Sequence, residues 1–254
     1  MSRTFIGILA ALVLAYAAMC VALFFLQRSL IYFPTRANPG SGISTQPFAV
    51  HGADLRLSVR PLPGAKAVLY FGGNAEDVSV NLPAFSSAFP DHAIYLLHYR
   101  GYGGSSGDPS EEAFHADALA LFDRVHAAHP SVVAVGRSLG SGVAIRLASL
   151  RPVSRLVLVT PYDSLLALAA QQFPYFPVGW LLVDTFESWR HAPGITAPTL
   201  ILAAEHDEII PRASSELLFS RFAKGVASYT VIAGAGHNSI SESPAYLPAL
   251  RGVP

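Results

Sequence analysis

The segment VVAVGRSLGSGVAIRLA (132–148) decides the fold expected for this chain. It opens with a short, continuous apolar run, which is typical of a strand buried on both faces of a parallel sheet. Gly136, Ser138 and Gly140 follow as a G-x-S-x-G pattern, and the apolar residues after them have helical spacing. The segment therefore predicts a strand that turns abruptly into a helix, with a serine at the corner.

A serine at such a corner is held in a strained backbone conformation with its hydroxyl above the sheet. Neighbouring elements crowd the positions two before and two after it, which favours glycine there. The N–H of the next residue, Leu139, lies at the amino end of the helix, where it can donate to an oxyanion. The pattern also occurs in glycine-rich helix starts, but here it stands between a strand-like run and an amphipathic helix. We therefore interpret Ser138 as a nucleophile and the Leu139 N–H as an oxyanion donor.

A serine nucleophile needs a base, and the base needs an acid that orients it. In a strand–turn–helix arrangement of this kind, the order along the chain is serine, acid, histidine. His237 lies in VIAGAGHNS (231–239), directly after a predicted strand, and Asp207 lies in ILAAEHDEIIP (201–211), directly after the preceding strand. We therefore predict a catalytic triad of Ser138, Asp207 and His237.

Two further residues bear on this assignment. Asp163 follows the strand after the nucleophile and could supply the acid in a variant arrangement; otherwise we expect it to cap or brace the helix that begins there. His206 adjoins Asp207 and would point away from the site if Asp207 faces it, so we interpret His206 as structural.

The loop FGGNAE (71–76) is the expected source of a second oxyanion donor. It follows a strand-like run and has a flexible glycine pair, and we assign the donor to the N–H of Asn74. A phosphate-binding loop is the alternative for a glycine pair, but no G-K-[ST] sequence is nearby. No cluster of His, Asp and Glu has metal-ligand spacing, so we expect neither a metal nor a cofactor.

Strand-like and helical patterns alternate along the rest of the chain, which favours an α/β fold with a mostly parallel central sheet flanked by helices. We expect Asp108 to cap the helix that follows it, with Pro109 in the first turn. The strand-like runs are 55–63, 67–71, 93–99, 132–136, 155–160, 199–207 and 228–237.

The N-terminal segment Phe5–Leu26 contains no charged residue and no proline. As a helix it would extend roughly 33 Å, enough to cross a hydrocarbon core of ~30 Å. A cleaved signal peptide is the alternative, but its apolar core is shorter and ends in a small-residue site, unlike FFLQR (24–28). We expect a retained single-pass anchor in a bacterial inner membrane. Arg3 and Arg28 flank it on both sides and leave the orientation open.

The 254 residues carry 17 basic and 17 acidic side chains, so nucleic acid is not an expected partner. Cys20 is the only cysteine and lies inside the anchor, which excludes a cysteine nucleophile and a disulfide within the chain. We expect an anchor at 1–28, a connector at 29–48 and one catalytic domain at 49–254.

A small lid is expected at about 163–190, between the strands expected at 155–160 and 199–207. Four of its aromatic residues could line an acyl pocket, although an ordinary packed helix–loop–helix is the alternative. These residues are Phe173, Tyr175, Phe176 and Trp180.

Taken together, these residues resemble the α/β-hydrolase superfamily, and within it the membrane-tethered serine hydrolases of the BEM46-like and ABHD13/ABHD17-like group. The resemblance implies the same roles for Ser138, Asp207 and His237. Gly72 stands where the group commonly has histidine. The backbone N–H donor of that loop can survive this change, but any role of the histidine side chain in shaping the loop is lost. The resemblance covers roughly 28–245 and rests on LQRSLIYFP (26–34), YFGGNAED (70–77), HYRGYGGSSG (98–107), GRSLGSGVA (136–144), TPYDSL (160–165), APTLILAAEHDEIIP (197–211) and GAGHN (234–238).

The function expected from the residues and the resemblance is hydrolysis of carboxylic esters or thioesters with a small-molecule or lipid-like acyl group. Some members of the group are implicated in thioester cleavage on lipidated proteins. A peptidase or amidase of the same fold is one alternative, because the triad chemistry is shared. A catalytically silent, membrane-tethered binding module is another. An epoxide hydrolase or dehalogenase would need a carboxylate at position 138.

Overall fold

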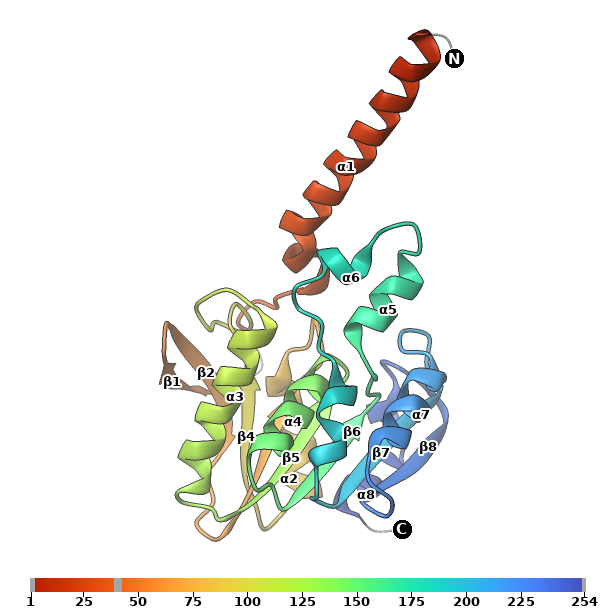
Figure 1. The fold of residues 1–254 in the computed structure, drawn as a ribbon. Coiled ribbons are helices and arrows are strands. Elements are labelled where there is room, and N and C mark those ends of the chain that lie inside the picture. Colours follow the sequence, from red (N-terminus) through yellow and green to blue (C-terminus); the bar gives the residue numbers. More distant parts are fainter. Residues whose placement is uncertain (1–2, 39–42, 253–254) are drawn as a thin grey trace.

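One mixed sheet forms the centre of the molecule, and a long N-terminal helix projects from it (Figure 1). The computed structural model describes residues 3–38 and 43–252. Within these residues the sheet has eight strands in the order β1-β2-β4-β3-β5-β6-β7-β8. The two pairings at the β1 edge are antiparallel, and all the others are parallel. The expected mostly parallel sheet flanked by helices is confirmed.

The elements follow the predicted alternation of strands and helices. The strands are β1 (Thr45–Val50), β2 (Ala53–Arg60), β3 (Lys66–Phe71), β4 (Ala93–His98), β5 (Ser131–Arg137), β6 (Arg155–Val159), β7 (Thr199–His206) and β8 (Ala227–Gly236). The α-helices are α1 (Arg3–Ile31), α2 (Leu82–Ala88), α3 (Glu111–His126), α4 (Leu139–Leu150), α5 (Leu165–Gln172), α6 (Val178–Leu181), α7 (Arg212–Arg221) and α8 (Tyr246–Arg251). Short 3₁₀ turns are η2 (Val78–Asn81), η3 (Ser188–Arg190), η4 (Ala192–Gly194) and η5 (Ile240–Glu242).

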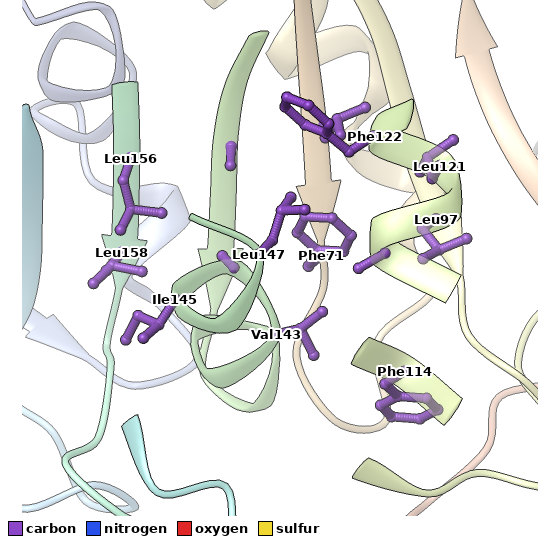
Figure 2. Packing of buried hydrophobic residues seen from close by; sticks show 14 of the residues in the cluster. Phe71, Leu97, Phe114, Leu121, Phe122, Val143, Ile145, Leu147, Leu156 and Leu158 are labelled. Atoms are coloured by element: carbon purple, nitrogen blue, oxygen red, sulfur yellow. The ribbon is translucent and has the colours of Figure 1, made fainter. Parts of the chain in front are cut away.

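Helices cover both faces of the sheet because alternate side chains of each strand point to opposite sides. Leu69 and Phe71 of β3 pack in one cluster with residues of α3, α4 and α7, part of which Figure 2 shows. Val68 and Tyr70 of the same strand pack on the other face with residues of α2 and α8. Burial on both faces explains why the parallel strands read as continuous apolar runs.

The connector expected at 29–48 is shorter in the structure. Helix α1 continues to Ile31, and β1 begins at Thr45. The reason is that Tyr32 and Phe48 are 2% and 4% exposed and belong to the core, because burying a large aromatic side chain stabilises the fold. The predicted ranges also include 1–2, 39–42 and 253–254, which lie outside the described residues.

Helix α3 begins later than predicted, because its N-cap is Ser110 and not Asp108. Ser110 has an extended backbone, with φ −159° and ψ 157°, and its hydroxyl accepts a hydrogen bond from the N–H of Ala113. That is the geometry that satisfies an unpaired donor at a helix start.

Candidate active site

Ser138 occupies the corner between β5 and α4. Its φ of 49° and ψ of −117° fall in a region that residues with a side chain rarely adopt. Its N–H donates to the carbonyl of Val159 in the neighbouring strand, at 2.9 Å. Its carbonyl accepts from the N–H and the hydroxyl of Ser141, at 2.9 and 2.6 Å. Hydrogen bonds on both sides therefore hold the strained conformation.

The glycines on either side of this corner are needed because other backbone segments approach closely. A Cβ atom at Gly140 would overlap the carbonyl oxygen of Phe71, at the end of β3. A Cβ atom at Gly136 would lie 2.7 Å from the Cβ of Ala144, one turn into α4. The crowding predicted around Ser138 is present, and it presses the start of α4 against the ends of the central strands.

Two residues from neighbouring strand ends reach Ser138. His237 directly follows β8, and its Nε2 lies 3.0 Å from the Ser138 Oγ. Asp207 directly follows β7, and both of its carboxylate oxygens lie 2.9 Å from His237 Nδ1. The His237 and Asp207 side chains are only 5% and 4% exposed. The structure thus brings the three predicted residues into one hydrogen-bonded chain, with the spacing that a general base and its orienting acid require.

Backbone groups fix the acid and the base in place. Asp207 Oδ1 accepts from the N–H groups of Ile209 and Ile210, at 3.0 and 2.7 Å. The carboxylate of Glu208 accepts from the N–H of His237 at 3.0 Å, and this bond lowers the pKa of Glu208. The loops after β7 and β8 are therefore joined to each other as well as to Ser138.

The glycine loop after β3 lies beside the serine. A Cβ atom at Gly73 would be 3.5 Å from the Cβ of Ser138. The Asn74 side chain is turned toward the N-terminal segment: its Nδ2 donates to the carbonyl of Ile31 at 2.5 Å, and its Oδ1 accepts from the Tyr102 hydroxyl at 2.7 Å. Among the described residues, the backbone N–H groups of Asn74 and Leu139 make no hydrogen bond to a protein acceptor.

Sequence reasoning missed a partly buried ion pair that joins the glycine loop to the histidine loop. The carboxylate of Glu76 accepts from the N–H of Gly73 at 2.5 Å and from the Tyr70 hydroxyl at 2.6 Å. Arg137 lies 3.7 Å from Glu76 and donates to the carbonyl of His237 at 3.3 Å. Burial is the largest single influence and acts to lower the pKa of Arg137, but Glu76, Tyr70 and Tyr246 together raise it. The available signal was a charged residue inside each of the two glycine motifs.

The rival residues have other partners. Asp163 is buried and accepts from Arg221 at 3.3 Å; burial raises the pKa of Asp163, while Arg221 acts against this. The expectation that Asp163 caps α5 is wrong, because the Ser164 hydroxyl accepts from the N–H of Ala167. His206 is 71% exposed and lies 3.7 Å from Glu205, so it is a surface residue and not a structural one.

Known proteins share this architecture. A family profile described as alpha/beta hydrolase fold matches residues 66–187. The uncharacterized protein Rv2307c of Mycobacterium tuberculosis is 36% identical over 227 residues, which are 84% of this chain and 80% of that protein. The chain belongs to the α/β-hydrolase family.

Two other proteins illustrate the range of this family. The alpha/beta hydrolase domain-containing protein aho-3 of Caenorhabditis elegans is 31% identical over 201 residues, 76% of this α/β-hydrolase but 59% of that protein. An esterase of Pyrococcus furiosus superposes with a TM-score of 0.67 at 16% identity, covering 87% of this chain and 96% of the esterase. At this low sequence identity, the similarity to the esterase shows a shared fold and nothing more.

The hydrolase has a pocket of about 620 Å³ with Ser138 in its wall. Leu139 and Asn74 line it near the serine, and the segment with α5 and α6 lines it further out. Phe173 and Phe176 belong to this lining as expected. The expectation for Tyr175 and Trp180 is wrong: they are 86% and 89% exposed, because they lie on the outer side of the same segment.

Another wall of the pocket comes from α1, which the sequence did not indicate. Leu23, Gln27, Leu30 and Ile31 line the pocket. The Gln27 side chain donates to the carbonyl of Leu181 at 3.0 Å and accepts from the N–H of Val183 at 2.7 Å. The motif LQRSLIYFP after the apolar segment was the available signal, because it places polar groups at the end of the helix.

A buried carboxylate holds the end of α1 against the same segment. Asp184 accepts from Arg28 at 3.1 Å and from the Tyr32 hydroxyl at 3.0 Å. Burial raises the pKa of Tyr32 well above its usual value, and the charge of Asp184 raises it further. The Tyr32 hydroxyl therefore remains a hydrogen-bond donor at neutral pH.

Proposed function

We propose that this α/β-hydrolase is a membrane-anchored serine hydrolase that cleaves carboxylic esters or thioesters with an apolar acyl group. The observation that carries the proposal is the position of His237, between the Ser138 hydroxyl and the Asp207 carboxylate, at the wall of a largely apolar pocket. An acyl chain fits such a pocket, and its carbonyl carbon would reach the serine.

In the first half of the reaction, Ser138 Oγ attacks the carbonyl carbon of the substrate while His237 Nε2 takes the hydroxyl proton. Asp207 holds the imidazole through Nδ1 and stabilises its positive charge. The N–H groups of Leu139 and Asn74 are proposed to bind the developing oxyanion, since no protein acceptor competes for them within the described residues. His237 then returns the proton to the leaving alcohol or thiol, and an acyl-enzyme remains.

In the second half, a water molecule enters where the alcohol or thiol has left. His237 takes a proton from this water, the resulting hydroxide attacks the acyl carbonyl, and the same oxyanion donors act again. Collapse of the intermediate breaks the bond to Ser138 Oγ, which recovers its proton from His237. The products are a carboxylic acid and the free enzyme.

A retained anchor is supported by the contacts at the end of α1. All of its residues are solvent-exposed or only partly covered, and it is long and apolar enough to cross a membrane. A signal sequence would satisfy the same test, but cleavage after residue 28 would remove Leu23 and Gln27 from the pocket and Arg28 from Asp184. A functional pocket wall built from this helix favours an anchor that stays attached.

A fluorophosphonate probe tests the serine mechanism, because it reacts with an activated serine. We expect it to label the wild type and Ser149→Ala, a control for another serine of α4, but not Ser138→Ala. Loss of the nucleophile should lower turnover of a p-nitrophenyl ester by on the order of 10⁶. Equal labelling of wild type and Ser138→Ala would refute the assignment.

The bond that is cleaved needs a separate comparison. Butyryl esters, thioesters and anilides of matched size should be hydrolysed by the same preparation, and we expect the ester and thioester to react much faster than the anilide. Preference for the anilide would favour an amidase or peptidase. A folded protein that neither reacts with the probe nor hydrolyses any of the three would be a binding module.

A further inference from the structure

The segment between Asp163 and Asp184, here called the lid, contains no charged residue. Several of its large apolar side chains nevertheless face outward: Tyr175 is 86% exposed, Trp180 89% and Val183 54%. Large exposed apolar side chains gathered in one short segment are typical of contact with another apolar phase. Tryptophan and tyrosine are the residues that favour the boundary between lipid and water.

The lid lies along the side of α1 and not only at its end. The rings of Tyr16 and Phe176 stack with centroids 5.9 Å apart, and the Tyr16 hydroxyl donates to the carbonyl of Tyr175 at 2.8 Å. Gln27 makes the contacts with Leu181 and Val183 nearer to the domain. Figure 1 shows α6 beside the domain end of α1. These contacts extend along α1 from Tyr16 to Gln27, about three turns of the helix.

The length of α1 sets the depth of the lid. From Arg3 to Tyr16 the helix rises only about 20 Å, whereas the hydrocarbon core of a bilayer is ~30 Å thick. If α1 crosses a membrane from Arg3, the hydrocarbon layer therefore continues past Tyr16 toward Leu23. The part of the lid that contacts Tyr16 then lies inside the lipid. Arg28, which pairs with Asp184, is roughly 38 Å from Arg3 and lies outside it.

We propose that the lid dips into the membrane that α1 crosses, with Tyr175 and Phe176 in the hydrocarbon layer and Trp180 at its boundary, and that the pocket of Ser138 takes the acyl chain of a membrane lipid ester directly from that layer. The pocket wall is shared between α1, through Leu23 and Leu30, and the lid, through Leu168 and Phe176. An acyl chain passing between them would contact mostly apolar side chains on its way from the bilayer to the serine. This inference rests on the proposed function and names its substrate class.

The position of the lid can be measured in the full chain, because the chain has only two tryptophans. Trp189→Phe leaves Trp180 as the single tryptophan. This variant is reconstituted in phosphatidylcholine vesicles whose acyl chains carry bromine, which quenches tryptophan fluorescence. We expect Trp180 emission to be blue-shifted and quenched by the brominated chains. Trp180→Phe is the matched control: it leaves Trp189, in a turn packed against α4 and α7, and its emission should not change. Quenching of Trp180 by aqueous iodide and not by brominated lipid would overturn the proposal.

The source of the substrate is tested with Tyr175→Lys, since the Tyr175 side chain is exposed beside Tyr16 and does not line the pocket. Hydrolysis of a short, water-soluble ester should match the wild type. Hydrolysis of a long-chain ester embedded in vesicles should fall on the order of tenfold, because a lysine is strongly disfavoured in hydrocarbon. An unchanged rate on the embedded ester would overturn delivery from the lipid. Failure of the wild type on the soluble ester would instead refute the proposed function, and the quenching result would still decide where the lid lies.

Discussion

At the scale of single residues, Asp207 contacts His237 through both carboxylate oxygens, so the proposed role of the acid can be tested without disturbing the serine. Asp207→Asn should lower kcat by roughly 10⁴, because an amide can present an N–H to Nδ1, select the wrong imidazole tautomer and leave the imidazolium without its partner. Steady-state hydrolysis of a short-chain ester measures the loss.

Asp163→Asn is the matched control, since Asp163 is also a buried aspartate near the end of a neighbouring strand. The Asp163 side chain is 7% exposed and pairs with Arg221, so the change should cost about 1–3 kcal/mol of stability, but it should leave kcat close to that of the wild type. If Asp163→Asn were inactive and Asp207→Asn active, the acid would be Asp163, while Ser138 and His237 would keep their proposed roles.

The close packing around Gly140 leads to a second prediction, which concerns the stability of the protein. Gly140→Ala places a methyl group against the carbonyl oxygens of Phe71 and Gly72, so we expect a loss of about 1–3 kcal/mol in the free energy of unfolding. Gly194→Ala is the control, because nothing lies within 4 Å of the added atom. Urea denaturation in detergent compares the two variants, and equal midpoints would contradict the close packing at the corner.

Residues at strand ends could be predicted because the carboxyl ends of parallel strands meet at one edge of a sheet. Ser138, Asp207 and His237 each come at the end of a strand-like run, so their proximity follows from the chain order and the parallel pairing of β5 to β8. Glu76 and Arg137 could not be paired in this way, because the partner of a charged side chain depends on the path of the loops around it.

At the scale of elements, the contact between α1 and the lid depends on Asp184, which is 4% exposed. Asp184→Asn removes the charge that Arg28 and Tyr32 share, and we expect it to lower the free energy of unfolding by about 1–3 kcal/mol. The expected result is a lower melting temperature in detergent and faster proteolysis within the lid.

Asp91→Asn is the control for that change, because Asp91 pairs with Lys66 at the surface, where the two side chains are 57% and 52% exposed. Exposed ion pairs contribute little to stability, so the melting temperature should stay at the wild-type value. A similar effect of both substitutions would mean that Asp184 does not hold the lid against α1.

The place of the lid in the chain could be predicted, but not its inner face. Helix α6 has only four residues, Val178–Leu181, which is too short for a periodic apolar pattern to indicate which side is buried. The connector was overestimated because the Pro-, Gly- and Ser-rich stretch 34–48 is typical of a linker, and nothing in the sequence shows that Tyr32 and Phe48, at either end of it, reach the core.

At the scale of the whole molecule, the alternation of strands and helices indicated the fold class, but not the order of the strands. The chain places β4 between β2 and β3, so that β3 pairs with β5 at the centre of the sheet. The strand order depends on which neighbouring strand each connecting helix leads to, and no local sequence pattern indicates this. The junction of α1 with the pocket is hidden for the same reason, since Ile31 and Asn74 are far apart in sequence.

The pocket is assembled from the anchor and the domain together, and this makes a prediction for the whole chain. Leu23→Trp should fill the space between α1 and the lid, and lower the ratio of kcat/KM for long-chain to short-chain esters by about tenfold, since small changes in an apolar pocket discriminate to this extent. Phe25→Trp should leave the ratio unchanged, because Phe25 is 77% exposed and two helical positions away, on the opposite face of α1. Activity measured in the same detergent on esters of increasing chain length compares them. If Leu23→Trp kept the wild-type ratio, the acyl chain would run along the domain alone, and α1 would serve only to hold the enzyme at the membrane.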